Sequence, residues 1–172
     1  MKTTLRTTAA AAVFAVILGG GAVAQLGAAT ATANLAASSS VANNCTISTG
    51  ALAFGAYDPI VTNASANLDG TGTVTIACTK GATTTLELGL GANATGSTRR
   101  LSDGAGTPSY LTYEIYSNVG RTTVWGTGVD AVTPAAAPSK TARNFTAYGR
   151  VAGNQDVPAG NYTDTVVATV NF

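Results

Sequence analysis

The sequence predicts an all-β domain, an antiparallel Ig-like β-sandwich, and three observations support this prediction. Charged residues make up only 10% of the 172 residues, against about a quarter in ordinary domains, and Gly, Ala and Thr replace them. Short segments after Cys45 alternate apolar and polar side chains, as half-buried strands do. Turn-forming pairs such as Asp58-Pro59, Asp69-Gly70 and Asp103-Gly104 separate these segments. About seven short strands without a helical repeat are typical of such a sandwich.

The N-terminal residues predict export. Lys2 and Arg6 precede an apolar stretch over residues 9–18, and Ala22-Val23-Ala24 matches a small-residue cleavage motif. We therefore expect a signal peptide over residues 1–24, with cleavage as late as residue 33 as the alternative. The apolar stretch is short for a membrane span, which needs roughly 20 apolar residues. We expect no stable membrane insertion of the mature chain.

Cys45 and Cys78 are the two cysteines of the chain. Outside the cytosol such a pair most simply forms a disulfide bond. Each cysteine also shares the inward parity of its segment with an aliphatic residue, Ile47 or Ile76, so a buried bridge between adjacent strands is geometrically natural. Metal binding is the weaker alternative, because the chain has no His and no CxxC motif.

The alternating segments give the expected strands in chain order. A bend near Gly50 would bring Cys45, Ile47, Leu52 and Phe54 to one face of the first strand. The following strands are expected at residues 73–79, 85–90, 110–116, 144–151 and 162–172.

Three features between these strands also lead to predictions. Arg99-Arg100 is interpreted as a solubilising edge or turn. Trp125, the single tryptophan, is expected as a core anchor, with an exposed contact as the alternative. Residues 126–140 are expected to form a long mobile loop.

The last segment, Tyr162 to Phe172, ends in an apolar strand pattern. Its apolar parity contains one charged residue, Asp164, and then Val166, Ala168, Val170 and Phe172. Chain ends fray unless something holds them. An apolar strand at this end must therefore be paired and buried, by this chain or by another.

The segment before Cys45, residues 25–44, allows two interpretations. One parity carries small or apolar residues: Ala33, Leu35, Ala37, Ser39 and Val41. Its composition fits a flexible Ala/Ser linker. Its alternation fits a thin strand that inserts into a narrow groove.

Three motifs resemble spore coat protein U domains. They are NCTISTGALAFGAYDP (44–59), GTVTIACTKG (72–81) and AGNYTDTVVATVNF (159–172). Such domains are subunits (pilins) of archaic chaperone–usher pili. The resemblance implies that residues 45–172 form an incomplete Ig-like sandwich, which a donor strand from another subunit completes.

The resemblance also assigns roles to residues. Residues 25–44 would be the donor extension, with Ala33, Leu35, Ala37, Ser39 and Val41 as the inserted face. Val166, Ala168, Val170 and Phe172 would form one wall of the acceptor groove, and Cys45 and Cys78 match the family's disulfide bond. Ala and Ser stand where bulkier aliphatics are expected, which leaves the donor register open by two residues in either direction.

The partners implied by the resemblance are identical or related pilin subunits, a periplasmic chaperone and an outer-membrane usher. Basic residues of the chaperone would hold the carboxylate of Phe172 during assembly. The chain would pass through the periplasm to a fibre on the cell surface, where adhesion and biofilm formation are the expected roles.

Catalysis has little support in the sequence. There is no His for a His-based relay, and the two glutamates, Glu87 and Glu114, both fall on the outward parity of their strands. We expect no enzyme activity, no cofactor and no metal site. A net charge of +1 without a long basic run does not predict nucleic-acid binding. A non-fimbrial coat protein of the same fold and a secreted carbohydrate-binding sandwich remain as alternatives.

Overall fold

The computed structural model describes residues 27–172. The expected signal peptide, residues 1–24, lies outside the described residues. The chain divides into two units after Ser39. Residues 27–44 contain no helix or strand, and their side chains are exposed.

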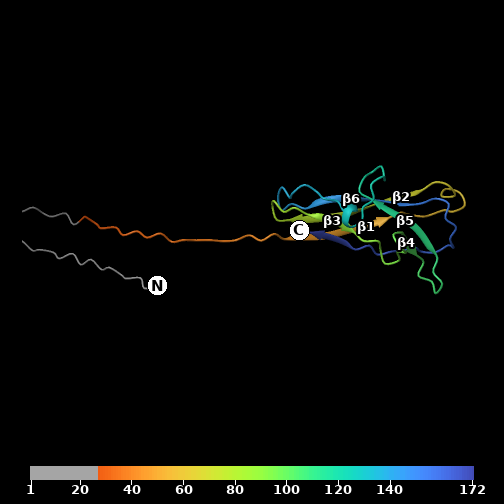
Figure 1. Ribbon diagram of the computed structural model, residues 1–172, viewed down its shortest axis with the longest axis horizontal. Coiled ribbons are helices and arrows are strands. Elements are labelled where there is room, and N and C mark those ends of the chain that lie inside the picture. Colours follow the sequence, from red (N-terminus) through yellow and green to blue (C-terminus); the bar gives the residue numbers. More distant parts are fainter. Residues whose placement is uncertain (1–26) are drawn as a thin grey trace, which may run out of the picture. The chain divides into compact units, whose positions relative to one another are not determined.

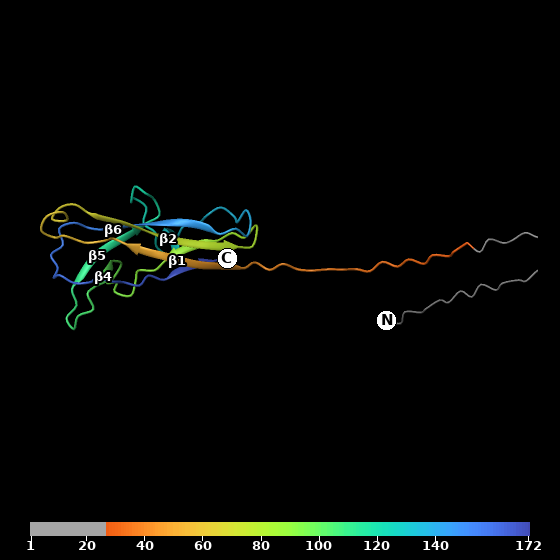
Figure 2. The same ribbon diagram turned by 180° about the vertical axis from the view of Figure 1, so that it is seen from behind.

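The strands and one short 3₁₀ helix are β1 (Cys45–Ala53), β2 (Leu68–Cys78), β3 (Thr85–Leu88), β4 (Arg99–Ser102), β5 (Tyr110–Tyr116), η1 (Gly128–Asp130), β6 (Arg143–Val151) and β7 (Ala168–Asn171). The five strands β1-β2-β6-β5-β4 form one sheet in that order, and β3 pairs with β7 in a second sheet. Every strand pair is antiparallel. Figures 1 and 2 show the sheets from the front and from behind. The predicted all-β, Ig-like antiparallel fold is confirmed.

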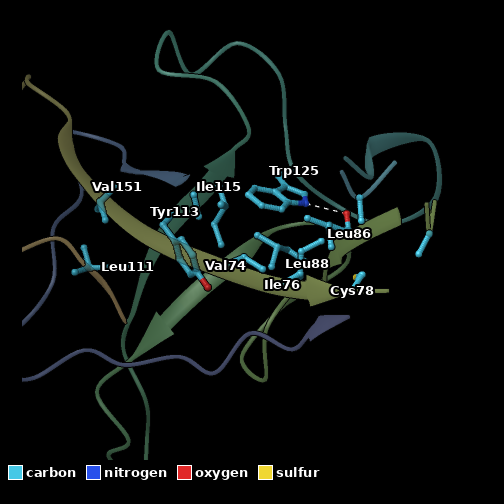
Figure 3. Packing of buried hydrophobic residues seen from close by; sticks show 13 residues of the cluster. Val74, Ile76, Cys78, Leu86, Leu88, Leu111, Tyr113, Ile115, Trp125 and Val151 are labelled. Atoms are coloured by element: carbon cyan, nitrogen blue, oxygen red, sulfur yellow. Dashed lines mark hydrogen bonds between the residues drawn. The ribbon is translucent and has the colours of Figure 1, made fainter. Parts of the chain in front are cut away.

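The core lies between the two sheets. Inward side chains of β2, β3, β5 and β6 are buried there because each strand alternates buried and partly exposed positions. Trp125 is 1% exposed, and its indole N–H donates to the carbonyl of Leu86 at 3.0 Å. Figure 3 shows this bond within the cluster of buried side chains that includes Leu88, Ile115 and Val74. The prediction of Trp125 as a core anchor is confirmed.

The disulfide bond joins Cys45 to Cys78 at directly opposite positions of β1 and β2. The pairing of β1 with β2 changes register between Gly50 and Ala53, which is the predicted irregularity in the first strand. Cys45, Ile47, Leu52 and Phe54 all pack against the core cluster. The bulge therefore turns all four side chains toward the core, as the sequence pattern predicts.

The expected turn at Asp69-Gly70 is wrong. Both residues lie in β2, opposite Arg150 and Gly149. Two contacts explain why these residues form a strand and not a turn. Asp69 accepts two hydrogen bonds from the guanidinium of Arg150, and the ring of Phe54 lies against Gly70 and Gly149. A side chain at Gly149 would overlap that ring, since its Cβ would lie 2.6 Å from Phe54 Cε1.

Two other expectations are also corrected. Arg99 is not a solubilising edge residue, because it lies in β4 with only 1% of its surface exposed. The stretch 126–140 is a loop, but the sheets hold it in place. Val132 exchanges two backbone hydrogen bonds with Leu86, and Ala137 is buried and donates to the carbonyl of Ala82.

The C-terminal strand forms a shorter hydrogen-bonded ladder than the sequence pattern predicts. Only Ala168–Asn171 forms a ladder, with β3. The alternation of half-buried and exposed side chains nevertheless runs from Tyr162 to Val170. Phe172 departs from it, since 56% of its surface is exposed.

Candidate functional site

In the described part of the chain, β1 and β7 each have one edge with neither a ladder partner nor an isolated bridge, whereas the outer edges of β3 and β4 carry bridges to Val132 and Thr163. β1 pairs only with β2, and β7 pairs only with β3. β1 and β7 contact each other without pairing. The C-terminal end of β7 lies beside the start of β1 in both views, so the two strands run in opposite directions (Figures 1 and 2). The first and last strands of the domain thus border the same opening.

A groove of about 320 Å³ occupies this opening. One wall is formed by β1, from Thr49 to Leu52, and the other by the segment from Asp164 to Ala168. The floor is the apolar core, including Val74, Leu88 and Ile115, which are at most 5% exposed.

The wall residues are less buried than the floor. Inward side chains such as Ile47 and Leu52 on β1, and Val166, Ala168 and Val170 on the facing segment, are only half-buried. These side chains occupy inward positions, yet neighbouring residues bury them less than they bury the inward side chains of β2, β5 and β6. The sandwich is therefore open along this line.

Backbone bonds of the C-terminal wall point away from the groove. The carbonyls of Val167 and Thr165 accept from the amides of Gly89 and Ala92, and Thr163 exchanges two bonds with Ser102. The wall is thus fixed on one side by the β3–β4 region, while its other side faces β1. An additional strand could hydrogen-bond to both walls at once.

Asp164 is the charged residue among the groove's lining residues. Its Oδ2 accepts from the phenol of Tyr113 at 2.7 Å, and its Oδ1 accepts from the backbone and side-chain nitrogens of Asn93, both at 3.1 Å. Burial, followed by the hydrogen bond to Asp164, raises the pKa of the Tyr113 phenol above its usual range. Gly91 leaves room for the carboxylate, because a Cβ there would lie 1.9 Å from Oδ2.

A second cavity, of about 840 Å³, continues from the groove. It shares Leu52, Phe54 and Asp164 with the groove and extends beneath residues 157–163. Asp164 therefore lies where the groove opens into the larger space.

Arg99 supports the groove from behind. Its guanidinium donates to the carbonyls of Leu88, Gly89 and Trp125, at 2.9–3.1 Å, and pairs with the carboxylate of Glu114. These partners come from both sheets and from the segment after β5. Arg99 thus ties the end of β3, which forms part of the floor, to the larger sheet.

The residues that the sequence predicts at the site lie in different environments in the structure. Val166 and Ala168 line the groove, Val170 lies beyond this lining in β7 opposite Leu86, and Phe172 is exposed. The candidate donor residues Ala33, Leu35, Ala37, Ser39 and Val41 are all exposed, with Leu35 at 94% and Val41 at 85%. Their assignment as a donor face stays a prediction.

Sequence reasoning missed two contributors to the site. Leu52 and Phe54 form the far wall, and only their inward parity pointed to them. Asp164 was visible as a charge on an apolar parity, which is a signal of a polar group with partners inside a fold.

The two glutamates have structural contacts. Glu87 accepts from the amide of Gly128, and Glu114 pairs with Arg99 and accepts from the amide of Ile115. They lie in different sheets. Residues 27–172 include no cluster of three or more His, Cys, Asp or Glu placed to hold a metal ion. No helix in this described range is long and apolar enough to cross a membrane.

The fold and the groove define a class of protein: Ig-like sandwiches whose first and last strands leave one strand position open. The Spore Coat Protein U domain model matches residues 31–169. Protein U of Myxococcus xanthus is 40% identical over 157 residues, which cover 84% of this chain and 87% of that relative. The chain belongs to the Spore Coat Protein U domain family.

A solved structure shares the fold. A chain of the CsuC–CsuE chaperone–tip adhesion subunit pre-assembly complex, from archaic chaperone–usher Csu pili of Acinetobacter baumannii, superimposes with a TM-score of 0.53 and 24% identity. The match covers 77% of this chain and 40% of that chain, so this chain spans less than half of its length. The E. coli Hda pilus minor tip subunit HdaB gives a TM-score of 0.40 at 18% identity, over 73% of this chain and 79% of HdaB.

Proposed function

We propose that this chain is a structural subunit of a surface fibre of the archaic chaperone–usher class, assembled by donor-strand exchange. The observation that supports it most is the groove between β1 and β7, whose two walls each have a strand edge without a ladder partner in the described residues. The occupant would be the extension of a second copy or of a related subunit. Family membership and the shared fold of a Csu pilus complex add support.

Strand insertion has a clear physical gain here. Backbone groups along both walls would be paired, and alternate side chains of the extension would cover the half-buried core. Leu35 and Val41 are almost fully exposed before insertion. Burying each would contribute roughly 1.5–3 kcal/mol.

The same edges are a hazard before assembly, because an open apolar edge favours aggregation. We infer that a periplasmic chaperone covers the groove first, with its basic residues holding the carboxylate of Phe172, and that an outer-membrane usher exchanges it for the next subunit. In this scheme residues 1–24 are the signal peptide, 25–44 the donor extension and 45–172 the pilin domain. The fibre would serve adhesion and biofilm formation at the cell surface.

A second candidate is a coat protein of the same fold that does not form fibres. The family's description as a spore coat domain favours it. In that case the groove would be closed within a monomer or a small oligomer, and purified protein would not polymerise.

The test uses the full mature chain with matched variants. Leu35→Asp places a charge on the proposed inserted face, whereas Ala36→Asp places it on the opposite parity. We expect Leu35→Asp, like deletion of residues 30–41, to bind chaperone but form no fibres by electron microscopy. Ala36→Asp should assemble normally. Fibres from the deletion variant would overturn the proposal, and a stable monomer of the unaltered chain in the absence of chaperone would favour the coat protein.

A further inference from the structure

The lining of the groove carries one charged residue among apolar side chains, threonines and the phenol of Tyr113. Among its lining residues Asp164 is the charged one. An ionised carboxylate accepts about four hydrogen bonds, two at each oxygen. Oδ1 accepts two from Asn93, but Oδ2 accepts one, from Tyr113. Oδ2 therefore keeps one accepting position within the described contacts.

The proposed inserted face carries one matching group. Ala33, Leu35, Ala37 and Val41 offer no side-chain donor, whereas Ser39 has a hydroxyl. A buried carboxylate gains from each additional donor, and an apolar side chain against it gives none. The single hydroxyl of the proposed inserted face and the single charged residue of the groove lining are thus complementary.

We propose that Ser39 of a neighbouring copy donates a hydrogen bond to Oδ2 of Asp164 and thereby fixes the register and direction of the inserted strand. This inference rests on the proposed function, since it requires strand insertion. It assigns Asp164 as the specificity-determining residue of the groove.

Side-chain sizes agree with this register when the inserted strand runs antiparallel to residues 162–170. With Ser39 opposite Asp164, Leu35 faces Ala168, the smallest inward residue of the wall. The small residues Ala37 and Ala33 then face Val166 and Val170. Large side chains meet small ones at each of these three positions, as close packing requires.

A shift by two residues loses both features. In one direction Leu35 would face Val166 and Ala37 would face Asp164. In the other, Leu35 would face Val170 and Val41 would face Asp164. Either shift places two branched side chains opposite each other and an apolar group against the carboxylate.

The direction also decides which copy supplies the strand. In the antiparallel register Val41 lies at the Tyr162 end of the wall. The same copy's β1, which begins at Cys45, starts beside the C-terminal end of β7 (Figures 1 and 2). The wall from Tyr162 to Val170 is about 26 Å long at roughly 3.3 Å per residue. The four steps from Val41 to Cys45 reach at most about 14 Å. The extension therefore cannot fill its own groove in this register.

Cysteine cross-linking between full mature chains measures the register. Ser38 and Thr165 would lie opposite each other on the outward face, and Thr165 is exposed. Chains with Ser38→Cys are assembled with chains that carry Thr163→Cys, Thr165→Cys or Val167→Cys. We expect an intermolecular disulfide with position 165 and little with the other two, because directly opposite residues come within reach of a disulfide.

Moving the hydroxyl should move the cross-link. In the double variant Ala37→Ser/Ser39→Ala, the cross-link of position 38 is expected to pass from 165 to 163. Ser40→Ala, which removes an outward hydroxyl, is the control and should leave it at 165. A cross-link that stays at 165 in the double variant, or that forms at another position in the unaltered extension, would overturn the inference but not the proposed function. No cross-link at any of the three positions would also overturn the inference, and the proposed function would fail with it only if the unaltered mature chains formed no fibres.

Discussion

Replacing Arg99 with methionine should strongly destabilise the domain. The guanidinium is buried, with 1% of the side chain exposed, and it serves three backbone carbonyls and the carboxylate of Glu114. Methionine has similar length and no donor, so the variant keeps much of the packing volume while these acceptors lose their partner.

The cost can be worked out from those contacts. Leaving a buried acceptor without a partner costs about 1–3 kcal/mol, and removing one partner of a buried ion pair costs about 3–5 kcal/mol. Glu114 is 29% exposed, so water can hydrate part of its carboxylate and reduce the penalty. We therefore expect a total loss of about 3–5 kcal/mol in the free energy of unfolding, a large share of the 5–15 kcal/mol typical of a domain.

Urea denaturation followed by tryptophan fluorescence is the assay. Trp125 is the single tryptophan, it is buried, and its own carbonyl accepts from Arg99, so its emission reports on this region. Arg100→Met is the control. Arg100 lies over the ring of Tyr110 at 3.9 Å, donates one hydrogen bond to the carbonyl of Asn93 at 2.9 Å and is more exposed than Arg99, so its loss should cost about 1–2 kcal/mol. Equal losses for the two variants would refute the assignment of Arg99 as a buried clamp.

Three further predictions concern the core and the groove. Replacing both disulfide cysteines with serine releases a 33-residue loop, and should lower the free energy of unfolding by roughly 3.5–4 kcal/mol in urea titrations; an unchanged midpoint would contradict this. Gly91→Ala should destabilise more than Gly55→Ala, because both have positive φ but only the Cβ at Gly91 would overlap Asp164; equal thermal midpoints would count against the carboxylate's placement. Burial and the carboxylate of Asp164 raise the pKa of the Tyr113 phenol in the folded protein. The phenol's contribution to the free energy of unfolding is therefore complete below the pKa of an unfolded tyrosine, about 10, and is lost as the pH rises above that value. Tyr113→Phe should weaken that alkaline loss in denaturation curves measured between pH 8 and about 11, and an identical pH profile would argue against it.

Strands with a clear two-residue alternation could be predicted from the sequence. β5 begins and ends where its pattern does, and the irregularity at Gly50 follows from the change of inward parity between Ile47 and Leu52. The disulfide was likewise foreseeable, because each cysteine shares the inward parity of its strand. These features depend on neighbours along the chain, which a sequence displays directly.

Other features depend on partners that are distant in the sequence. β4 has only four residues, and two of them are arginines, so no alternation marked it. Arg99 is buried because three carbonyls from other segments converge on it, which no local pattern reveals. Asp69-Gly70 has the composition of a turn but lies in β2, because Arg150 and Phe54 lie against it.

Prediction of the groove depends both on local sequence patterns and on contacts between residues that are distant in the sequence. The apolar parity of the last strand predicted that it is paired and buried, and the resemblance to spore coat protein U domains assigned it as one wall of a groove. Its charged exception, Asp164, proved to have three hydrogen-bond donors. The opposite wall on β1 follows only from the sheet order, which leaves β1 and β7 as neighbours that do not pair.

In the proposed fibre, a strand from a second copy completes the sandwich. A cryo-electron-microscopy structure of fibres assembled from the mature chain tests it most directly. We expect density for residues 33–41 of a neighbouring copy between β1 and β7, hydrogen-bonded to both walls, with Ser39 beside Asp164. Fibres in which this groove is empty, or is filled by the extension of the same copy, would contradict it.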